Sequence, residues 1–214
     1  MNYQWARDFT LQLINRYSAA GVKIPETDND QADYLKRIPK LLDDAQVYAA
    51  TTTACIRELE PLAAMPCDEN GEWLVYTLPK NCWQLCGGGL VRYDGETFQR
   101  FHRYHPVGGN KIAVPRALQG ELAVEYFRYP RLLGDDPANA KELDNTVPVQ
   151  MALPYYAAAY LLLRDDADSH RRLKTEFEER LERLAERPQT DIHLVEDVYG
   201  GHFDTGDTSR GVIT

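Results

Sequence analysis

The chain has 214 residues, of which 43% are hydrophobic and 27% are charged, and its formal net charge is −9. This composition is ordinary for a globular protein with a sizeable core, and the acidic balance excludes a broad basic footprint for duplex DNA. Residues 1–20 contain Arg7, Asp8 and Arg16 among apolar residues, which does not fit an export signal. No apolar run reaches the ~20 residues that a membrane-spanning helix needs. We therefore expect a protein that is made in a cytoplasm and has no membrane partner.

Two helices are predicted in the N-terminal part of the chain. Apolar residues recur at helical spacing over residues 5–17, and Gly21 stands where a C-terminal cap is expected. A second helix begins near residues 28–30, which are good N-cap residues, and we expect it to continue towards Leu59. Pro39 lies inside this helix. Because proline removes a backbone donor and clashes with the preceding turn, it predicts either a kink or two separate helices.

The period of the apolar residues is closer to two from residue 72 to residue 128, where β-forming residues dominate. The run Gly87-Gly88-Gly89 predicts a hairpin turn, and further turns are expected at residues 94–95 and 108–110. We expect a compact antiparallel meander of about five or six short strands. Its strands are predicted at residues 72–78, 82–85, 90–93, 98–104, 111–114 and 121–128.

Helical patterns return in the C-terminal part. Thr146 can cap a helix that has Pro148 in its first turn, and residues 151–163 are apolar almost all round, which predicts a buried central helix. A charged helix with one apolar stripe is predicted at residues 169–187. Residues 189–214 are rich in Gly, Asp and Thr and have too little apolar content for a core of their own. We interpret them as a tail that becomes ordered against another surface.

The predicted fold class is α+β. The helices of residues 1–60 and 146–188 should pack together as a helical bundle, because each has only one apolar stripe to bury. Residues 72–130 should form an inserted antiparallel β domain, and residues 189–214 an extended C-terminal tail. Seven residues on the apolar stripes are expected in the core of the bundle. They are Leu35, Leu42, Tyr155, Ala158, Leu162, Phe177 and Leu181.

The cysteines do not have the spacing of a metal site. Cys55, Cys67, Cys82 and Cys86 follow irregular intervals with no Cys-x-x-Cys pair, so reduced, half-buried thiols are favoured over a zinc site. The glycine run at residues 87–89 lacks the Lys-Ser/Thr of a phosphate loop and precedes a strand, so a hairpin turn is favoured there over a nucleotide site.

The remaining candidates for catalysis or metal binding are equally sparse. His102 and His105 are three positions apart and would face opposite sides of a regular strand, so a shared metal would require a loop. Asp204, Thr205 and Asp207 surround a glycine, but no glutamate follows at the position that closes a calcium loop. We therefore expect no enzymatic activity, no bound metal and no cofactor.

Two surface features each allow two interpretations. Tyr155, Tyr156 and Tyr160 could form a base-stacking platform, but core packing with paired hydroxyls is favoured. A group of basic residues in the β part could contact phosphate, but ion pairs with nearby acidic residues are favoured. The basic residues are Arg92, Arg100, Arg103 and Lys111, and the acidic ones are Glu96, Glu121 and Glu125.

Several short segments are distinctive in their order along the chain. The N-terminal ones are residues 11–18 (LQLINRYS), 24–25 (IP), 33–35 (DYL) and 41–46 (LLDDAQ). The later ones are residues 78–85 (LPKNCWQL), 124–130 (VEYFRYP), 142–144 (ELD), 152–159 (ALPYYAAA), 161–166 (LLLRDD) and 196–201 (EDVYGG). In this order they resemble the head-to-tail connector (adaptor) proteins of siphophages and prophages. The resemblance covers most of the chain, although the β insertion goes beyond the simplest all-helical connectors.

The resemblance implies a structural virion protein without enzymatic activity, one subunit of a ring of about twelve copies. The ring would bind below the portal protein and offer a platform to the next neck or tail protein. Packaged DNA would pass through it without sequence-specific binding. The protein would be assembled in the host cytoplasm and lie in the neck of the virion. We expect Val198, Tyr199 and Phe203 in the tail to bind the portal protein, because a disordered apolar peptide can fold onto a partner.

Three other functions stay open. A tail terminator or completion protein would usually be dominated by a β-sheet, so the long C-terminal helices count against it. A host-directed binding module would be a monomer in solution and in its complexes. An enzyme would be favoured by a bound metal or a deep polar pocket.

Overall fold

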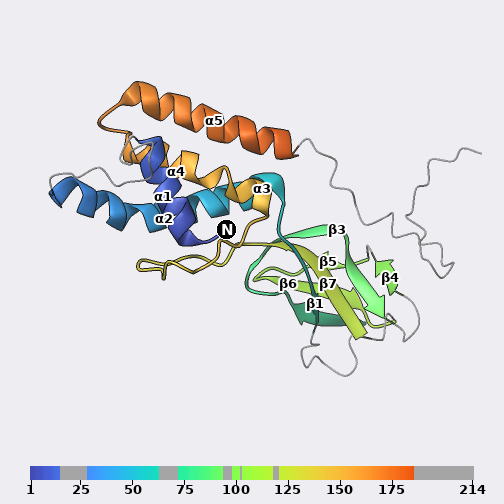
Figure 1. Cartoon of the computed structure of the whole chain (residues 1–214). Coiled ribbons are helices and arrows are strands. Elements are labelled where there is room, and N and C mark those ends of the chain that lie inside the picture. The colour runs from blue at the N-terminus through green and yellow to red at the C-terminus, as the bar shows by residue number, and fades with distance from the viewer. Residues whose placement is uncertain (15–27, 63–71, 94–97, 102, 118–120, 186–214) are drawn as a thin grey trace, which may run out of the picture.

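The computed structural model describes residues 1–14, 28–62, 72–93, 98–101, 103–117 and 121–185 (Figure 1). Its helices are α1 (Tyr3–Leu13), α2 (Asp28–Thr53), α3 (Val147–Gln150), α4 (Leu153–Leu161) and α5 (Ala167–Ala185). Its strands are β1 (Arg57–Pro61), β2 (Trp73–Thr77), β3 (Cys82–Tyr93), β4 (Phe98–Phe101), β5 (His105–Pro106), β6 (Lys111–Pro115) and β7 (Glu121–Arg128). All these strands pair antiparallel, so the fold class is α+β, as predicted. The predicted tail lies outside the described residues.

Helix α1 begins at an asparagine cap. The side chain of Asn2 accepts a hydrogen bond from the backbone N–H of Trp5 at 3.0 Å, which satisfies one donor that the helix itself leaves unpaired. Tyr3, Ala6, Thr10 and Leu11 form the buried face of the helix. The predicted helix continues to residue 17, but residues 15–27 lie outside the described chain.

Helix α2 is one helix of 26 residues that contains Pro39, so of the two predicted alternatives, a kink or two separate helices, the second is wrong. Pro39 is itself buried within this helix, where its nitrogen donates no backbone hydrogen bond. The prediction that the helix continues towards Leu59 is also wrong. The helix ends before Ala54, whose φ is +48°, and the chain then enters β1. The backbone of β1 is satisfied by pairing with β7, a partner from far along the chain.

The helical core surrounds α4, which contacts α1, α2 and α5. The single helix predicted to begin after Thr146 and to include the apolar run of residues 151–163 is divided into α3 and α4, with Pro154 in the first turn of α4. Thr146 precedes α3 as its N-cap residue, but its side chain makes no capping hydrogen bond. Of the seven expected core residues, four are buried and three are partly buried against the same cluster. The buried ones are Leu42, Ala158, Phe177 and Leu181, and the partly buried ones are Leu35, Tyr155 and Leu162.

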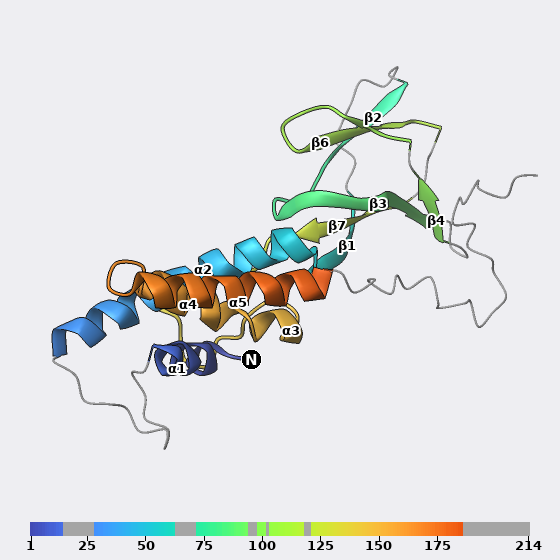
Figure 2. The ribbon, with the colours of Figure 1, turned by 90° about the horizontal axis from the view of Figure 1, so that it is seen from above.

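The strands form two sheets and do not follow each other as a meander. The larger sheet has the order β1-β7-β3-β4, and the smaller has the order β2-β6-β5. Figure 2 shows β2 and β6 in a layer apart from β3 and β7. The inner faces of the two sheets share a second hydrophobic core, which includes Tyr76, Leu90, Ile112, Val124 and Tyr126. Pairing of distant strands lets both sheets bury one face against each other.

The glycine run at residues 87–89 does not form the predicted hairpin turn, because β3 continues through it as one strand of 12 residues. Between Leu85 and Leu90 the partner on β7 moves only from Tyr126 to Val124, so β3 contains extra residues at this point. A Cβ atom on Gly89 would lie 2.8 Å from the carbonyl oxygen of Cys86. The glycines therefore allow an irregularity within a paired strand.

Candidate functional site

The helical part and the larger sheet meet at a buried arginine. Arg128 ends β7, and its side chain is only 10% exposed. Its Nε lies 2.8 Å from Oε2 of Glu58 on β1, its Nη2 lies 3.0 Å from Oδ1 of Asp144, and its Nη1 contacts Oδ2 of Asp144. A buried guanidinium group requires such pairing, because an unpaired charge there would carry a large desolvation penalty.

The ion pair between Arg128 and Asp144 shifts the pKa of each side chain in the direction that favours its charged form. Hydrogen bonding to Asp144 raises the pKa of Arg128 despite burial. Burial alone would raise the pKa of Asp144, but the hydrogen bonds from the Arg128 side chain and the Arg131 backbone outweigh it and hold this pKa below its usual value. Asp144 therefore remains a carboxylate at neutral pH and links residues 131–146 to the sheet.

Helix α2 binds the other side of residues 131–146, the connecting segment between β7 and α3. The carboxylate of Asp43 accepts the backbone N–H groups of Leu133 at 2.6 Å and Gly134 at 3.0 Å. Gln46 accepts the backbone N–H of Asp144 at 3.0 Å, and the Gln46 carbonyl accepts the side-chain N–H of Asn145 at 3.2 Å. Through these bonds the connecting segment contacts the helical part and the sheet together, so the two parts have a fixed relative position.

A buried tyrosine extends this polar junction into the sheet. The Tyr126 side chain is fully buried, and its hydroxyl group lies 3.0 Å from Glu60, 3.1 Å from Asn81 and 3.5 Å from Glu58. Burial, followed by the hydrogen bond to Glu60, raises the pKa of Tyr126 far above its usual value. The phenol thus stays protonated and donates its one hydroxyl proton to the carboxylate of Glu60 on β1.

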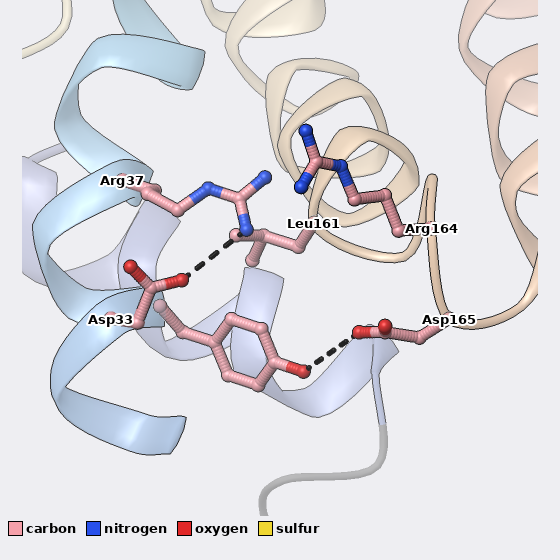
Figure 3. Close-up of a pocket in the computed structure, with 6 residues that line it drawn as sticks. Asp33, Arg37, Leu161, Arg164 and Asp165 are labelled. Atoms are coloured by element: carbon pink, nitrogen blue, oxygen red, sulfur yellow. Dashed lines mark hydrogen bonds and ion pairs between the residues drawn. The ribbon is translucent and has the colours of Figure 1, made fainter. Parts of the chain in front are cut away.

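A hollow lies at the end of the helical part, where α2 meets the connection between α4 and α5 (Figure 3). Arg37 is held there by Asp33 Oδ2 at 3.3 Å and by the Tyr160 carbonyl oxygen at 3.3 Å. Arg164 points its guanidinium group toward that of Arg37 (Figure 3). Arg164 is exposed and has no hydrogen bond or ion pair with the part of the chain that the structure describes. The hollow is lined by Asp33, Tyr34, Arg37, Leu161, Arg164 and Asp165.

The three tyrosines of α4 do not form one open platform. Tyr155 packs edge-on against Phe9 at 5.7 Å, with the guanidinium group of Arg180 over its ring. Tyr156 and Tyr160 contact each other at 4.4 Å on another side of the helix. Burial, followed by repulsion from Tyr160, raises the pKa of Tyr156 to about 12. All three are partly buried against the helical core, as the packing interpretation expects.

Of the residues considered for metal binding or reactivity, Cys82 and Cys86 are both on β3, whereas Cys55 precedes β1 and His105 is on β5. Cys55 and Cys82 are half-buried free thiols, Cys86 is a buried one, and Cys67 lies outside the described residues. Burial raises the pKa of Cys86 to about 11. His105 is exposed and packs against Trp73 at 4.8 Å. Within the described ranges, no group of three or more His, Cys, Asp and Glu residues could hold a metal ion.

Of the four basic residues singled out in the β part, Arg100 forms the ion pair that was favoured, whereas Arg92, Arg103 and Lys111 form none with a described residue. Arg100 lies 3.0 Å from Glu125, and Arg57, which the sequence did not single out, lies 3.5 Å from the same carboxylate. Several predicted site residues lie outside the described residues. They are Glu96, His102, Val198, Tyr199, Phe203, Asp204, Thr205 and Asp207.

The junction residues Arg128, Asp144, Asp43 and Gln46 were not predicted as a site. In the sequence these polar residues stand next to apolar ones, and that pattern does not show which distant residues they contact.

None of the helices in the described part of the chain is long and apolar enough to cross a membrane. No protein-family model matches the chain, and a search of curated proteins finds no match.

Proposed function

We propose that this protein is a structural virion subunit, a head-to-tail connector that forms a ring between the portal protein and the next neck or tail protein of a tailed phage. Packaged DNA passes through the ring without sequence-specific binding. The resemblance of the ordered segments to connector proteins motivates the proposal. The finer architecture expected for it is a helical bundle with lateral contacts, a projecting β module and a tail that binds the portal.

The observation that carries the proposal is the rigid junction at Arg128. A connector subunit must hold one partner at a fixed distance and orientation from another. Arg128 contacts β1 through Glu58 and the connecting segment through Asp144, and α2 holds that segment through Asp43. A subunit whose helical part and sheet are joined by these contacts fits the role of a scaffold protein. Its helical part can bind one neighbour and its sheet another, while the two parts keep their relative position.

The tail supplies the proposed contact with the portal. Val198, Tyr199 and Phe203 follow α5 in a segment with apolar residues but without enough of them for a separate core. Such a segment gains stability by folding onto a partner, where its apolar side chains are removed from water. In the virion neck these side chains would be buried in the portal protein.

The experiment is a mass measurement of the purified protein with and without the portal protein of the same phage or prophage, by light scattering and negative-stain imaging. Rings alone or on the portal are the expected result. A variant truncated after Pro188 should lose portal attachment and keep its helical circular dichroism. A truncated protein that still assembles with the portal would disprove the role of the tail.

The same measurement separates the alternatives. A monomer that ignores the portal would disprove the connector function and favour a host-directed binding module. A ring that binds purified tail tubes but not the portal would instead indicate a terminator. The test needs no assumption about which face of the ring meets DNA.

A further inference from the structure

The hollow at the end of the helical part favours a negatively charged occupant. Its two arginines direct like charges toward one another (Figure 3). Arg37 is partly neutralised by Asp33 at 3.3 Å. Asp165 also lines the hollow, but its carboxylate faces the Tyr34 hydroxyl group at 3.5 Å, and Arg164 has no ion pair with any described residue. Facing guanidinium groups repel unless an anion lies between them, and a carboxylate matches their planar donor geometry. The hollow therefore has the chemistry of a carboxylate-binding site.

The same chain carries an acidic projection with a fixed base, the loop of residues 131–142. Asp135 and Asp136 are adjacent and exposed in it, and neither forms an ion pair with a described residue. The base of the loop is held by Asp43, which accepts two backbone N–H groups, and by Lys141, whose Nζ lies 2.6 Å from the carbonyl oxygen of Leu133. The two carboxylates are thus presented on a preordered loop.

The projection and the hollow lie on different sides of the helical part. The loop extends beneath the helices, on the side away from α5, whereas Arg164 lies in the connection between α4 and α5 (Figure 1). We propose that Asp135 and Asp136 of one subunit bind the Arg37–Arg164 hollow of the next subunit. The inference rests on the proposed ring and names its lateral contact.

Such a contact joins two different surfaces of identical subunits. Repeating it either closes a ring or extends a filament, and closure depends on the rotation between neighbours. The fixed base of the loop lowers the entropy lost on binding, since its backbone is ordered before the subunits meet. Because the contact depends on charges near the surface, high salt should weaken it.

The test uses two charge-reversal variants of the full chain, Arg164→Glu and the double variant Asp135→Arg with Asp136→Arg. Each should lose ring assembly on the portal, with the subunit dissociation constant raised roughly tenfold or more. Each variant retains one intact half of the contact, and its altered half complements the altered half of the other variant. An equal mixture of the two should therefore recover rings, as measured by light scattering and native mass spectrometry.

Arg171→Glu is the matched control, because Arg171 is 77% exposed on α5 and pairs only with Asp168 of its own helix among the described residues. This variant should assemble like the wild type. Circular dichroism of each variant excludes misfolding as the cause of lost assembly.

Rings formed by Arg164→Glu alone, or a folded mixture that fails to assemble, would overturn the inference. Normal assembly with weakened duplex-DNA binding would also overturn it and identify phosphate as the occupant. Failure of the wild type to form rings would overturn the proposed function itself.

Discussion

Arg128 and Asp144 form a two-point ion pair that connects the end of β7 to the segment leading into α3. The guanidinium group also binds Glu58 of the neighbouring strand, so one side chain joins three stretches of the chain. Because the Arg128 side chain is 10% exposed and that of Asp144 19%, this pair is shielded from solvent far more than the ion pairs on the surface of α5.

Replacing Arg128 with Met should destabilise the protein by about 2–4 kcal/mol, because Glu58 and Asp144 would be left without their shared partner in a partly buried site. Urea unfolding followed by circular dichroism measures this loss. Arg183→Met is the control, since Arg183 is 72% exposed and its pair with Glu179 is within one helix. That variant should change the free energy of unfolding by less than about 0.5 kcal/mol. Equal effects of the two variants would contradict the role given to the junction.

Asp144→Asn should reveal a pH dependence of the junction. The folded-state pKa of Asp144 lies below its ordinary value of 3.8, so the carboxylate stabilises the folded protein above about pH 4. This stabilisation is lost as the pH falls through the lowered folded-state pKa. The free energy of unfolding should therefore differ most between wild type and variant at neutral pH and converge at strongly acidic pH. A difference that stays constant down to pH 2 would show that Asp144 acts without its charge.

Gly89→Ala should destabilise the protein, whereas Gly87→Ala should be nearly neutral. A Cβ at Gly89 would lie 2.8 Å from the Cys86 carbonyl oxygen and 3.0 Å from that of Glu125, and both are backbone atoms of paired strands. At Gly87 nothing lies within 4 Å of the added atom. We expect a loss of about 1–3 kcal/mol for the first variant, by thermal or urea unfolding. Similar stability of both variants would mean that β3 can shift away from β7 at this point.

Cys86 should be unreactive in the folded protein. Burial, followed by the nearby carboxylate of Glu125, raises its pKa to about 11, and the thiolate is the reactive form. At pH 8 only about one thiol in a thousand would be ionised. Alkylation with iodoacetamide and peptide mass spectrometry should modify Cys86 slowly in buffer and rapidly in urea. Fast modification of the native protein would show that β3 opens locally.

Local patterns in the sequence predicted the helices well and the sheet poorly. The apolar stripe of α5 identified Phe177 and Leu181, which are buried, because side chains at helical spacing share a face whatever their partner. The helix predicted towards Leu59 overlaps the first residues of β1, because this segment contains glutamate and leucine, which favour helices in isolation. Pairing with β7, a long-range interaction, overrode this preference.

The candidate sites depended on tertiary structure even more. Neither Arg128 with Asp144 nor Arg37 with Arg164 has a motif, since their spacing in the chain follows no local geometry. The sequence by itself determined the α+β class, the helical core residues of α4 and α5, and the position of the β-forming region, because helical and strand periodicities are properties of neighbouring residues. Only the tertiary structure decided the strand order, the continuity of β3 through its glycines and the partners of the charged side chains. All three depend on which distant segments bury their apolar faces together, and this pairing results from the packing of the whole chain and not from any local pattern.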